Sequence, residues 1–353
     1  MVQQSSKKST LQDVAAMANV SVSTVSHVLN GTAKISDPTK QRVMQAVHAL
    51  HYRPLGESGS RLLRQDRRTV GVIVQDIRNE FYSACASSVL SCADNTSYTV
   101  ILCDCGYDQQ HEVDLVRELI YQNISGLIFF GGTSNAEAIT LADSYNVPVV
   151  LANRHVNGFS SITFNHTKVI RELIADLCAA GRKRFLYLSE SPDLQSIRDR
   201  RDGFCLGMID NNISPEQYVM IADKRLQRHK VTTTRTVLQE YINEHGIDFD
   251  TIITSSDLIA IGALKYLGEC GCRVPEDVWL VGYDDISVSS LVVPSLTTVH
   301  QDTDRLGEEA FVLLNEMIQT GDHRPKQISI ENTIVIRDSA LKPAPAACIV
   351  HAE

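Results

Sequence analysis

Residues 20–31 of the 353-residue chain read VSVSTVSHVLNG, and the fold of the N-terminal part depends on how this stretch is interpreted. Its alternating β-branched and polar residues are typical of a strand. The same stretch places Val22 and Val25 at helical spacing and finishes on Asn30-Gly31, a pair that commonly ends a helix. Ser21 supplies a hydroxyl that caps a helix starting at the next residue. We therefore predict a helix over residues 22–29.

Two more short helices are expected around it. Thr10 followed three residues later by Asp13 is typical of a capped helix start, and apolar residues at helical spacing follow over residues 11–18. A third helix is predicted after Ser36, with Pro38 in its first turn. The first two helices, joined by a short turn, have the form of a helix-turn-helix.

The predicted second helix has a polar outer side of small residues. Ser21, Ser23, Thr24, Ser26 and His27 are expected to face outward while the valines face inward. Short hydroxyls and an imidazole let a helix lie deep in the DNA major groove and reach base edges or phosphates. An ordinary helical hairpin with a solvated face is the alternative. The pattern favours DNA binding.

Charge is distributed unevenly along the chain. Residues 1–68 hold ten Lys or Arg against four Asp or Glu, a net +6, which leaves −15 for the remainder of a chain of net charge −9. A basic N-terminal part attached to an acidic body fits attraction to DNA phosphates. Residues 55–68, polar and rich in glycine, are the expected linker.

The body is predicted to be α/β. Short apolar runs alternate with amphipathic helical patterns, which indicates βαβ units and parallel sheets. Seven such runs are too many for one ordinary sheet, so we expect two similar lobes. The predicted strands are residues 70–74, 99–102, 126–130, 148–151, 184–188, 251–254 and 278–281.

Several function classes lack support. The sequence contains no dinucleotide, P-loop, nucleophile-elbow or zinc-protease motif, so we expect no enzyme and no cofactor. The nine cysteines include Cys103–Cys105 and Cys270–Cys272, a spacing unusual for zinc, and we expect buried thiols and no metal. The sequence contains no run of about 18 apolar residues, the length that a membrane-spanning helix needs. We expect a cytoplasmic protein.

The motifs T-x-x-D-V-A, V-S-x-x-T-V-S-x-V-L-N and Y-x-P stand in order within residues 10–54, and this part resembles the DNA-binding domain of the LacI/GalR family of bacterial regulators. The resemblance continues through SSDLIAIGAL and VWLVGYDDI to about residue 340. It implies that Val22, Ser23 and His27 contact bases. It also implies that phosphates are contacted by Ser21, Thr24, Ser26 and Asn30.

The linker departs from the family pattern. Relatives carry a short hinge helix whose leucine enters the minor groove, whereas Gly56 and Gly59 here replace helix-forming residues. Leu62 is the expected minor-groove residue, with Leu63 as the alternative. A plain flexible linker is also open. His27 stands where arginine is more common, which suggests a different base preference.

For the body, the resemblance implies two lobes like those of a periplasmic sugar-binding protein, with an effector between them. Arg200 and Asp257 are the strongest candidates, because a guanidinium and a carboxylate can bind hydroxyls or a carboxylate through charge-assisted hydrogen bonds. Arg200 at the surface and Asp257 as a helix cap are the alternatives. The full set of expected effector residues is Phe81, Tyr82, Asn153, Phe164, Asn165, Arg200, Asp257, Asp284 and Gln301.

The resulting hypothesis is a repressor with four parts: a DNA-binding domain (1–54), a hinge (55–68), an effector-binding and dimerisation body (69–340) and a disordered tail (341–353). It is expected to bind a near-palindromic operator as a homodimer, with its affinity set by a small metabolite such as a sugar or sugar derivative. The alternative is a DNA-binding regulator without a small effector, whose body serves for dimerisation or protein docking.

Overall fold

The computed structural model describes residues 10–30, 35–50, 68–94, 96–133 and 135–340. Three helices form the N-terminal head: α1 (Leu11–Ala18), α2 (Val22–Asn30) and α3 (Asp37–Ala49). Thr10 caps α1 in the predicted manner, since its hydroxyl accepts from the Asp13 N–H and the Asp13 carboxylate accepts from the Thr10 N–H. The stretch at residues 20–31, whose alternation is typical of a strand, contains the helix α2, as predicted.

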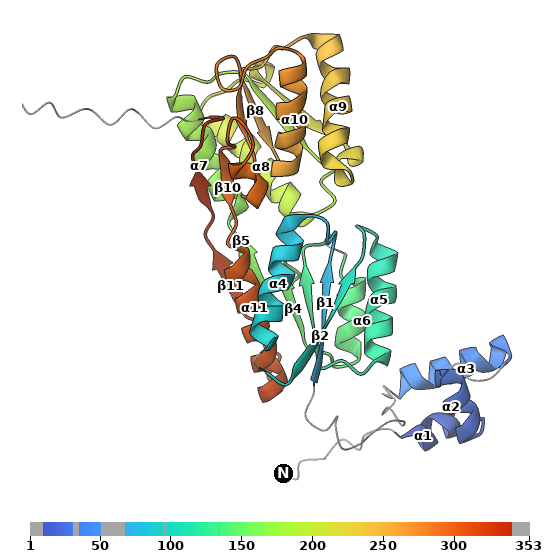
Figure 1. The fold of residues 1–353 in the computed structure, drawn as a ribbon. Helices are drawn as coiled ribbons and strands as arrows, with labels where there is room; N and C mark the ends of the chain where they lie inside the picture. Colours follow the sequence, from blue (N-terminus) through green and yellow to red (C-terminus); the bar gives the residue numbers. More distant parts are fainter. Residues whose placement is uncertain (1–9, 31–34, 51–67, 95, 134, 341–353) are drawn as a thin grey trace, which may run out of the picture.

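The body consists of two lobes, each a parallel sheet covered by helices on both faces (Figure 1). The first lobe has the strand order β11-β5-β4-β3-β1-β2. Its strands are β1 (Arg68–Val74), β2 (Tyr98–Asp104), β3 (Gly126–Phe130), β4 (Val149–Ala152), β5 (Ser160–Phe164) and β11 (Gln327–Ile330). Its helices are α4 (Glu80–Asp94), α5 (Gln109–Tyr121), α6 (Glu137–Ser144) and α11 (Thr303–Thr320).

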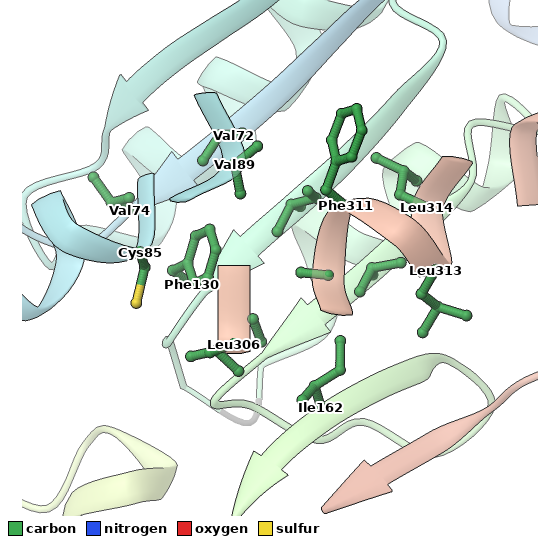
Figure 2. Close-up of a cluster of buried hydrophobic side chains, with 14 of the residues drawn as sticks. Val72, Val74, Cys85, Val89, Phe130, Ile162, Leu306, Phe311, Leu313 and Leu314 are labelled. Atoms are coloured by element: carbon green, nitrogen blue, oxygen red, sulfur yellow. The ribbon is translucent and has the colours of Figure 1, made fainter. Parts of the chain in front are cut away.

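Two apolar cores hold the first lobe together, one on each face of its sheet. Side chains of α4 and α11 meet one face, where Cys85, Val89, Leu306 and Phe311 pack on Phe130 and its neighbours (Figure 2). Side chains of α5 and α6 cover the opposite face. Because both faces are buried, the strands read as continuous apolar runs, which is why the sequence pattern indicated them.

The second lobe has the strand order β7-β6-β8-β9, with α7 and α8 on one face and α9 and α10 on the other. Its strands are β6 (Phe185–Ser189), β7 (Tyr218–Ala222), β8 (Thr251–Thr254) and β9 (Trp279–Val281), with an antiparallel pair β10 (Thr298–His300) and β12 (Thr333–Val335) beside them. Its helices are α7 (His166–Ala179), α8 (Gln195–Asp210), α9 (Lys230–His245) and α10 (Asp257–Glu269), and the short 3-10 helices are η1 (Pro215–Gln217), η2 (Lys224–Gln227) and η3 (Ser287–Ser290).

The chain passes between the lobes three times: from β5 to α7, from β10 to α11, and from β11 to β12. The strands' carboxyl ends in the two sheets face the junction between the lobes, which is where ligands of open parallel sheets bind. None of the described helices is both long and apolar enough to cross a membrane. Of the predicted linker only Arg68 is described, as the first residue of β1, and the predicted tail lies outside the described residues.

Candidate functional site

The first candidate surface is the outer side of α2. The Ser21 hydroxyl oxygen lies 2.8 Å from the hydroxyl oxygens of both Ser23 and Thr24, and it accepts from the Thr24 backbone N–H at 3.1 Å. Ser21, Ser23 and His27 are exposed, whereas Thr24 and Ser26 are half-buried. The small hydroxyls thus gather at the N-terminal end of the helix, where backbone N–H groups favour a phosphate oxygen.

The apolar residues of α2 divide between two surroundings. Val25 is completely buried against residues of α1 and α3, including Val14 and Val43, and this contact fixes the helix in the head. Val22 is 41 % exposed, so the expectation that the valines face inward is wrong for this residue. An exposed apolar side chain at this place can contact a thymine methyl group. The side chains of Asn30 and Leu62 lie outside the described residues.

The second candidate site is a small cavity of about 20 Å³ between the lobes. Five of the nine expected effector residues line it: Phe81, Tyr82 and Asn153 from the first lobe, and Arg200 and Asp284 from the second. Phe81 and Tyr82 belong to the first turn of α4, and their rings meet edge to face at 5.1 Å. Arg200 is buried within α8, so its alternative placement at the surface is excluded.

Arg200 is held on three sides. Its Nη1 donates to the backbone oxygen of Ser255 and to Asp284 Oδ1, the latter at 3.3 Å, and its guanidinium lies over the Tyr283 ring. Gln301 donates to the same Asp284 oxygen at 2.7 Å, so it stands behind the cavity wall. Burial raises the pKa of Asp284 to about 7, and Arg200 opposes that rise. The second-lobe wall thus carries a fixed cation beside a carboxyl group that titrates near neutral pH.

A buried imidazole joins Asn153 to the second lobe. His166 Nε2 lies 2.8 Å from Asn153 Oδ1, and its Nδ1 lies 2.7 Å from the Tyr283 hydroxyl. Asn332 donates to that hydroxyl at 3.0 Å. Burial, and then the neighbouring Arg200 charge, lower the pKa of His166 well below its usual value. A neutral imidazole can donate to the Asn153 oxygen and accept from Tyr283, and it thereby connects the lobes.

Three expected effector residues lie away from the cavity. Asp257 accepts from the Ser289 and Thr298 hydroxyls, each at 2.6 Å, and from a backbone N–H at 3.0 Å, so its carboxylate is satisfied inside the second lobe. Phe164 belongs to the first-lobe core. Asn165 caps α7 by accepting from the Lys168 N–H. The sequence-based choice of these residues is not supported by their positions.

Other cavity residues were missed by the sequence reasoning. Glu190 and Lys230 are buried in the second-lobe wall, and the Lys230 ammonium donates to Glu190 at 2.5 Å. Ser256, next to the favoured Asp257, is also in the wall, and first-lobe residues Asn79 and Tyr107 face it. Glu190 follows β6 directly, at the carboxyl end where ligand groups are expected, and that position could have indicated it.

A larger opening of about 670 Å³ adjoins this region, and Lys224, Arg225 and Arg228 contribute cations to its lining. Arg225 is already paired with Asp223 and Glu240 at 2.7 Å each. Arg228 donates across the lobes to the backbone oxygen of Gly106 at 2.6 Å. Arg225 and Arg228, two of these three cations, are therefore already engaged within the protein.

A helix-turn-helix head with a polar outer face, joined to a two-lobed body with a polar cavity between its lobes, is the architecture of a DNA-binding transcription regulator. The described residues contain no group of three or more His, Cys, Asp or Glu placed to hold a metal ion. The comparisons with known proteins agree on the class.

Residues 10–54 match the model of the lacI family of bacterial regulatory proteins, and residues 174–340 match a periplasmic binding protein-like domain. The transcriptional regulator RegA of Clostridium acetobutylicum is 30 % identical over 93 % of this chain and 98 % of its own. The ribose operon repressor of Halalkalibacterium halodurans is 28 % identical over 94 % and 96 %. The Lac repressor dimer, solved with operator and the anti-inducer ONPF, is 27 % identical with a TM-score of 0.67, over 94 % and 99 %.

The chain therefore belongs to the lacI family of bacterial regulatory proteins. It is a DNA-binding transcriptional regulator, and the predicted fold, an α-helical head followed by a two-lobed body of parallel sheets, is confirmed.

Proposed function

We propose that this regulator represses transcription in the cytoplasm as a homodimer on a near-palindromic operator, and that a sugar or sugar derivative bound between its lobes sets its affinity for DNA. The proposed division is a DNA-binding domain (1–54), a hinge (55–68), a body (69–340) and a tail (341–353). The body performs no catalysis in this proposal. Support comes from relatives that are named as transcriptional regulators and repressors.

One observation carries the effector part of the proposal. The inter-lobe cavity is lined by polar side chains from both lobes, with Arg200 and Asp284 on one side and Asn153 on the other. A ligand held by both lobes stabilises their closed arrangement, and its differential affinity for the two arrangements is what changes DNA affinity. The likeness to a ribose operon repressor supports a sugar as the ligand.

The DNA part of the proposal assigns base contacts to Val22, Ser23 and His27. Their positions on the outer side of α2 support this assignment. Phosphate contacts are assigned to Ser21, Thr24, Ser26 and Asn30, and the minor-groove contact to Leu62.

The second candidate is a regulator without a small effector. The cavity volume favours it, because about 20 Å³ is close to the space that one or two ordered waters need. A sugar enters only if the lobes separate or side chains move. In that case the body would serve for dimerisation or for docking of a protein.

The deciding experiment uses the full chain and an operator fragment obtained by selection from random DNA. Thermal unfolding is followed with sugars, sugar phosphates, nucleobases and organic acids, and operator affinity is measured with each stabilising compound. A ligand at 100 times its dissociation constant adds about 2.7 kcal/mol to the free energy of unfolding. We expect a compound that both stabilises the chain and changes operator affinity.

The matched variants are Arg200→Ala in the cavity wall and Arg235→Ala on the exposed surface of α9. Arg235 pairs with Glu269 at the surface and does not line the cavity. Loss of the ligand response in the first variant alone supports the cavity as the effector site. If no compound of the panel alters operator binding, the result supports the second candidate, a regulator without a small effector.

A further inference from the structure

The second-lobe wall contains a buried ion pair that none of the sequence motifs identified. Glu190 directly follows β6 and Lys230 begins α9, and both side chains are at least nine-tenths buried. The Lys230 ammonium donates to one carboxylate oxygen of Glu190, and the Ser255 hydroxyl donates to the other. Burial opposes ionisation of Glu190, but the Lys230 charge and the donated hydrogen bonds prevail and lower its pKa. Glu190 is therefore a carboxylate at neutral pH.

The charges of Lys230 and Glu190 balance each other. A phosphate or carboxylate group placed against this pair must separate the ammonium from its carboxylate or add an unbalanced buried charge, and both are unfavourable. A hydroxyl group leaves the pair intact.

Unsatisfied groups near the cavity indicate what else the ligand carries. Within the described residues, the buried Ser256 hydroxyl and Arg200 Nε have no hydrogen-bond partner, and neither does the oxygen Gln301 Oε1. An ammonium group has three N–H donors, and Glu190 takes one from Lys230. Donors and acceptors are thus both available. A hydroxyl group donates and accepts at once, whereas a phosphate or carboxylate oxygen only accepts.

We propose that Glu190 and Lys230 form a subsite for a pair of neighbouring hydroxyl groups, so that the effector is an uncharged polyhydroxylated molecule and not its phosphate or acid. Glu190 accepts from one hydroxyl, Lys230 donates to the other, and Ser256 completes the subsite. This inference rests on the proposed effector function. It adds two specificity-determining residues to that function and fixes the charge of the ligand.

The test compares binding by calorimetry to the full-length chain. The neutral probes are ribose, glucose, cellobiose and mannitol; the anionic probes are ribose 5-phosphate, glucose 6-phosphate, gluconate and glucuronate; adenine, guanine and uracil form a third group. We expect the wild-type chain to bind a neutral polyhydroxylated probe at least tenfold more tightly than any anionic probe.

Two variants separate a ligand contact from a structural role. Glu190→Gln leaves the Lys230 cation unpaired, so the affinity for the neutral probe should fall at least tenfold while that for its acid or phosphate rises. The double variant Glu190→Gln/Lys230→Gln contains no unpaired charge. Its affinity for the neutral probe should fall to the same extent, and its affinity for the anionic probe should not rise. A purely structural pair would not alter the ratio of the two affinities. Glu269→Gln, in an exposed ion pair of the same lobe, is the matched control.

Operator binding by each variant shows that the variant is folded. If Glu190→Gln does not fold, the affinities of the double variant test whether Glu190 and Lys230 contact the ligand. The proposal is overturned if the wild type binds only anionic probes or only nucleobases, or if neither variant changes the affinity for the neutral probe. An anionic probe that changes operator affinity overturns this inference alone. A panel in which nothing binds and operator affinity never changes overturns the proposed effector function together with it.

Discussion

The guanidinium of Arg200 lies 3.8 Å from the centre of the Tyr283 ring, and Tyr283 in turn reaches His166 through its hydroxyl. The next residue along the chain, Asp284, pairs with the same guanidinium. One arginine of α8 is therefore fixed by two consecutive residues that follow β9, and the imidazole beyond them contacts Asn153 of the first lobe. Tyr283 connects the cavity wall to the inter-lobe contact.

The first prediction concerns pH. The pKa of Asp284 is raised to about 7 by burial, against about 3.9 in an unfolded chain. The folded state therefore binds the proton more tightly, and the stability from this group is fully present below about pH 4 and lost as pH rises through 7. Against Asp284→Asn, the difference in free energy of unfolding should decline by up to about 1.4 kcal/mol per pH unit between pH 5 and 6.5.

Urea denaturation of both proteins from pH 5 to 8.5 checks this. Asp257, whose pKa burial raises to about 6, is present in both proteins, so the difference reports the titration of Asp284 together with its charge interaction with Asp257. A difference that stays constant with pH would show that Asp284 has an ordinary pKa.

The elements predicted correctly are those with local signals. The α2 helix follows from its cap and its apolar spacing, and seven strands follow from apolar runs. Five strands were missed: β5, β7, β10, β11 and β12. All but β7 are short and less uniformly apolar, whereas β7 is an apolar run that the sequence analysis did not select. The return of α11 and β11 to the first lobe was also missed. That return depends on contacts between residues more than 150 positions apart, such as Lys326 to Ser160, which no local pattern records.

The cavity was predicted less completely, for a related reason. Arg200 and Asp284 follow from the family resemblance, but Lys230 reads as a solvated loop lysine until Glu190, 40 residues earlier, is placed beside it. Asp257, the predicted residue, lies one position after the residue that lines the cavity. The chain turns from β8 into α10 at this point, so Ser256 faces the cavity while Asp257 points back to Ser289.

The second prediction uses two glycines of α10. A Cβ on Gly262 would lie 2.6 Å from the backbone oxygen of Val231 in α9, whereas a Cβ on Gly268 meets nothing within 4 Å. Gly262→Ala should lower the free energy of unfolding by about 1–3 kcal/mol through overpacking. Gly268→Ala should raise it by up to about 1 kcal/mol because alanine favours the helix. Thermal and urea unfolding measure the stability of both variants. If the two variants are destabilised equally, the close packing of Gly262 against α9 is contradicted.

The third prediction concerns a contact between the lobes outside the cavity. Glu80, the first residue of α4, accepts from the Ser287 backbone N–H at 2.6 Å and from the Ser287 hydroxyl at 2.8 Å. Glu80→Ala removes both bonds and should lower the population of the closed arrangement. The apparent ligand affinity should then fall about 3- to 10-fold, in proportion to that population.

Small-angle scattering measures the population of the closed arrangement, and calorimetry with the ligand found in the screen measures the apparent affinity. Ser83→Ala, one turn further along α4, is the control, because the Ser83 hydroxyl bonds only to the Glu80 backbone oxygen among its recorded contacts. Unchanged affinity in Glu80→Ala would show that this contact does not influence closure.

The fourth prediction concerns the base preference set by His27 on α2. Arginine can donate two hydrogen bonds to guanine O6 and N7, a contact that imidazole cannot reproduce, and a bidentate contact discriminates by about 1–3 kcal/mol. Selection of DNA sequences by wild type and His27→Arg should therefore differ at one base pair in each half-site, where the variant prefers guanine. The change should appear symmetrically because a homodimer presents α2 twice. Met17→Ala, exposed on α1, should leave the selected sequence unchanged. If His27→Arg instead lowers the affinity for all DNA sequences equally, residue 27 contacts the DNA backbone and not a base.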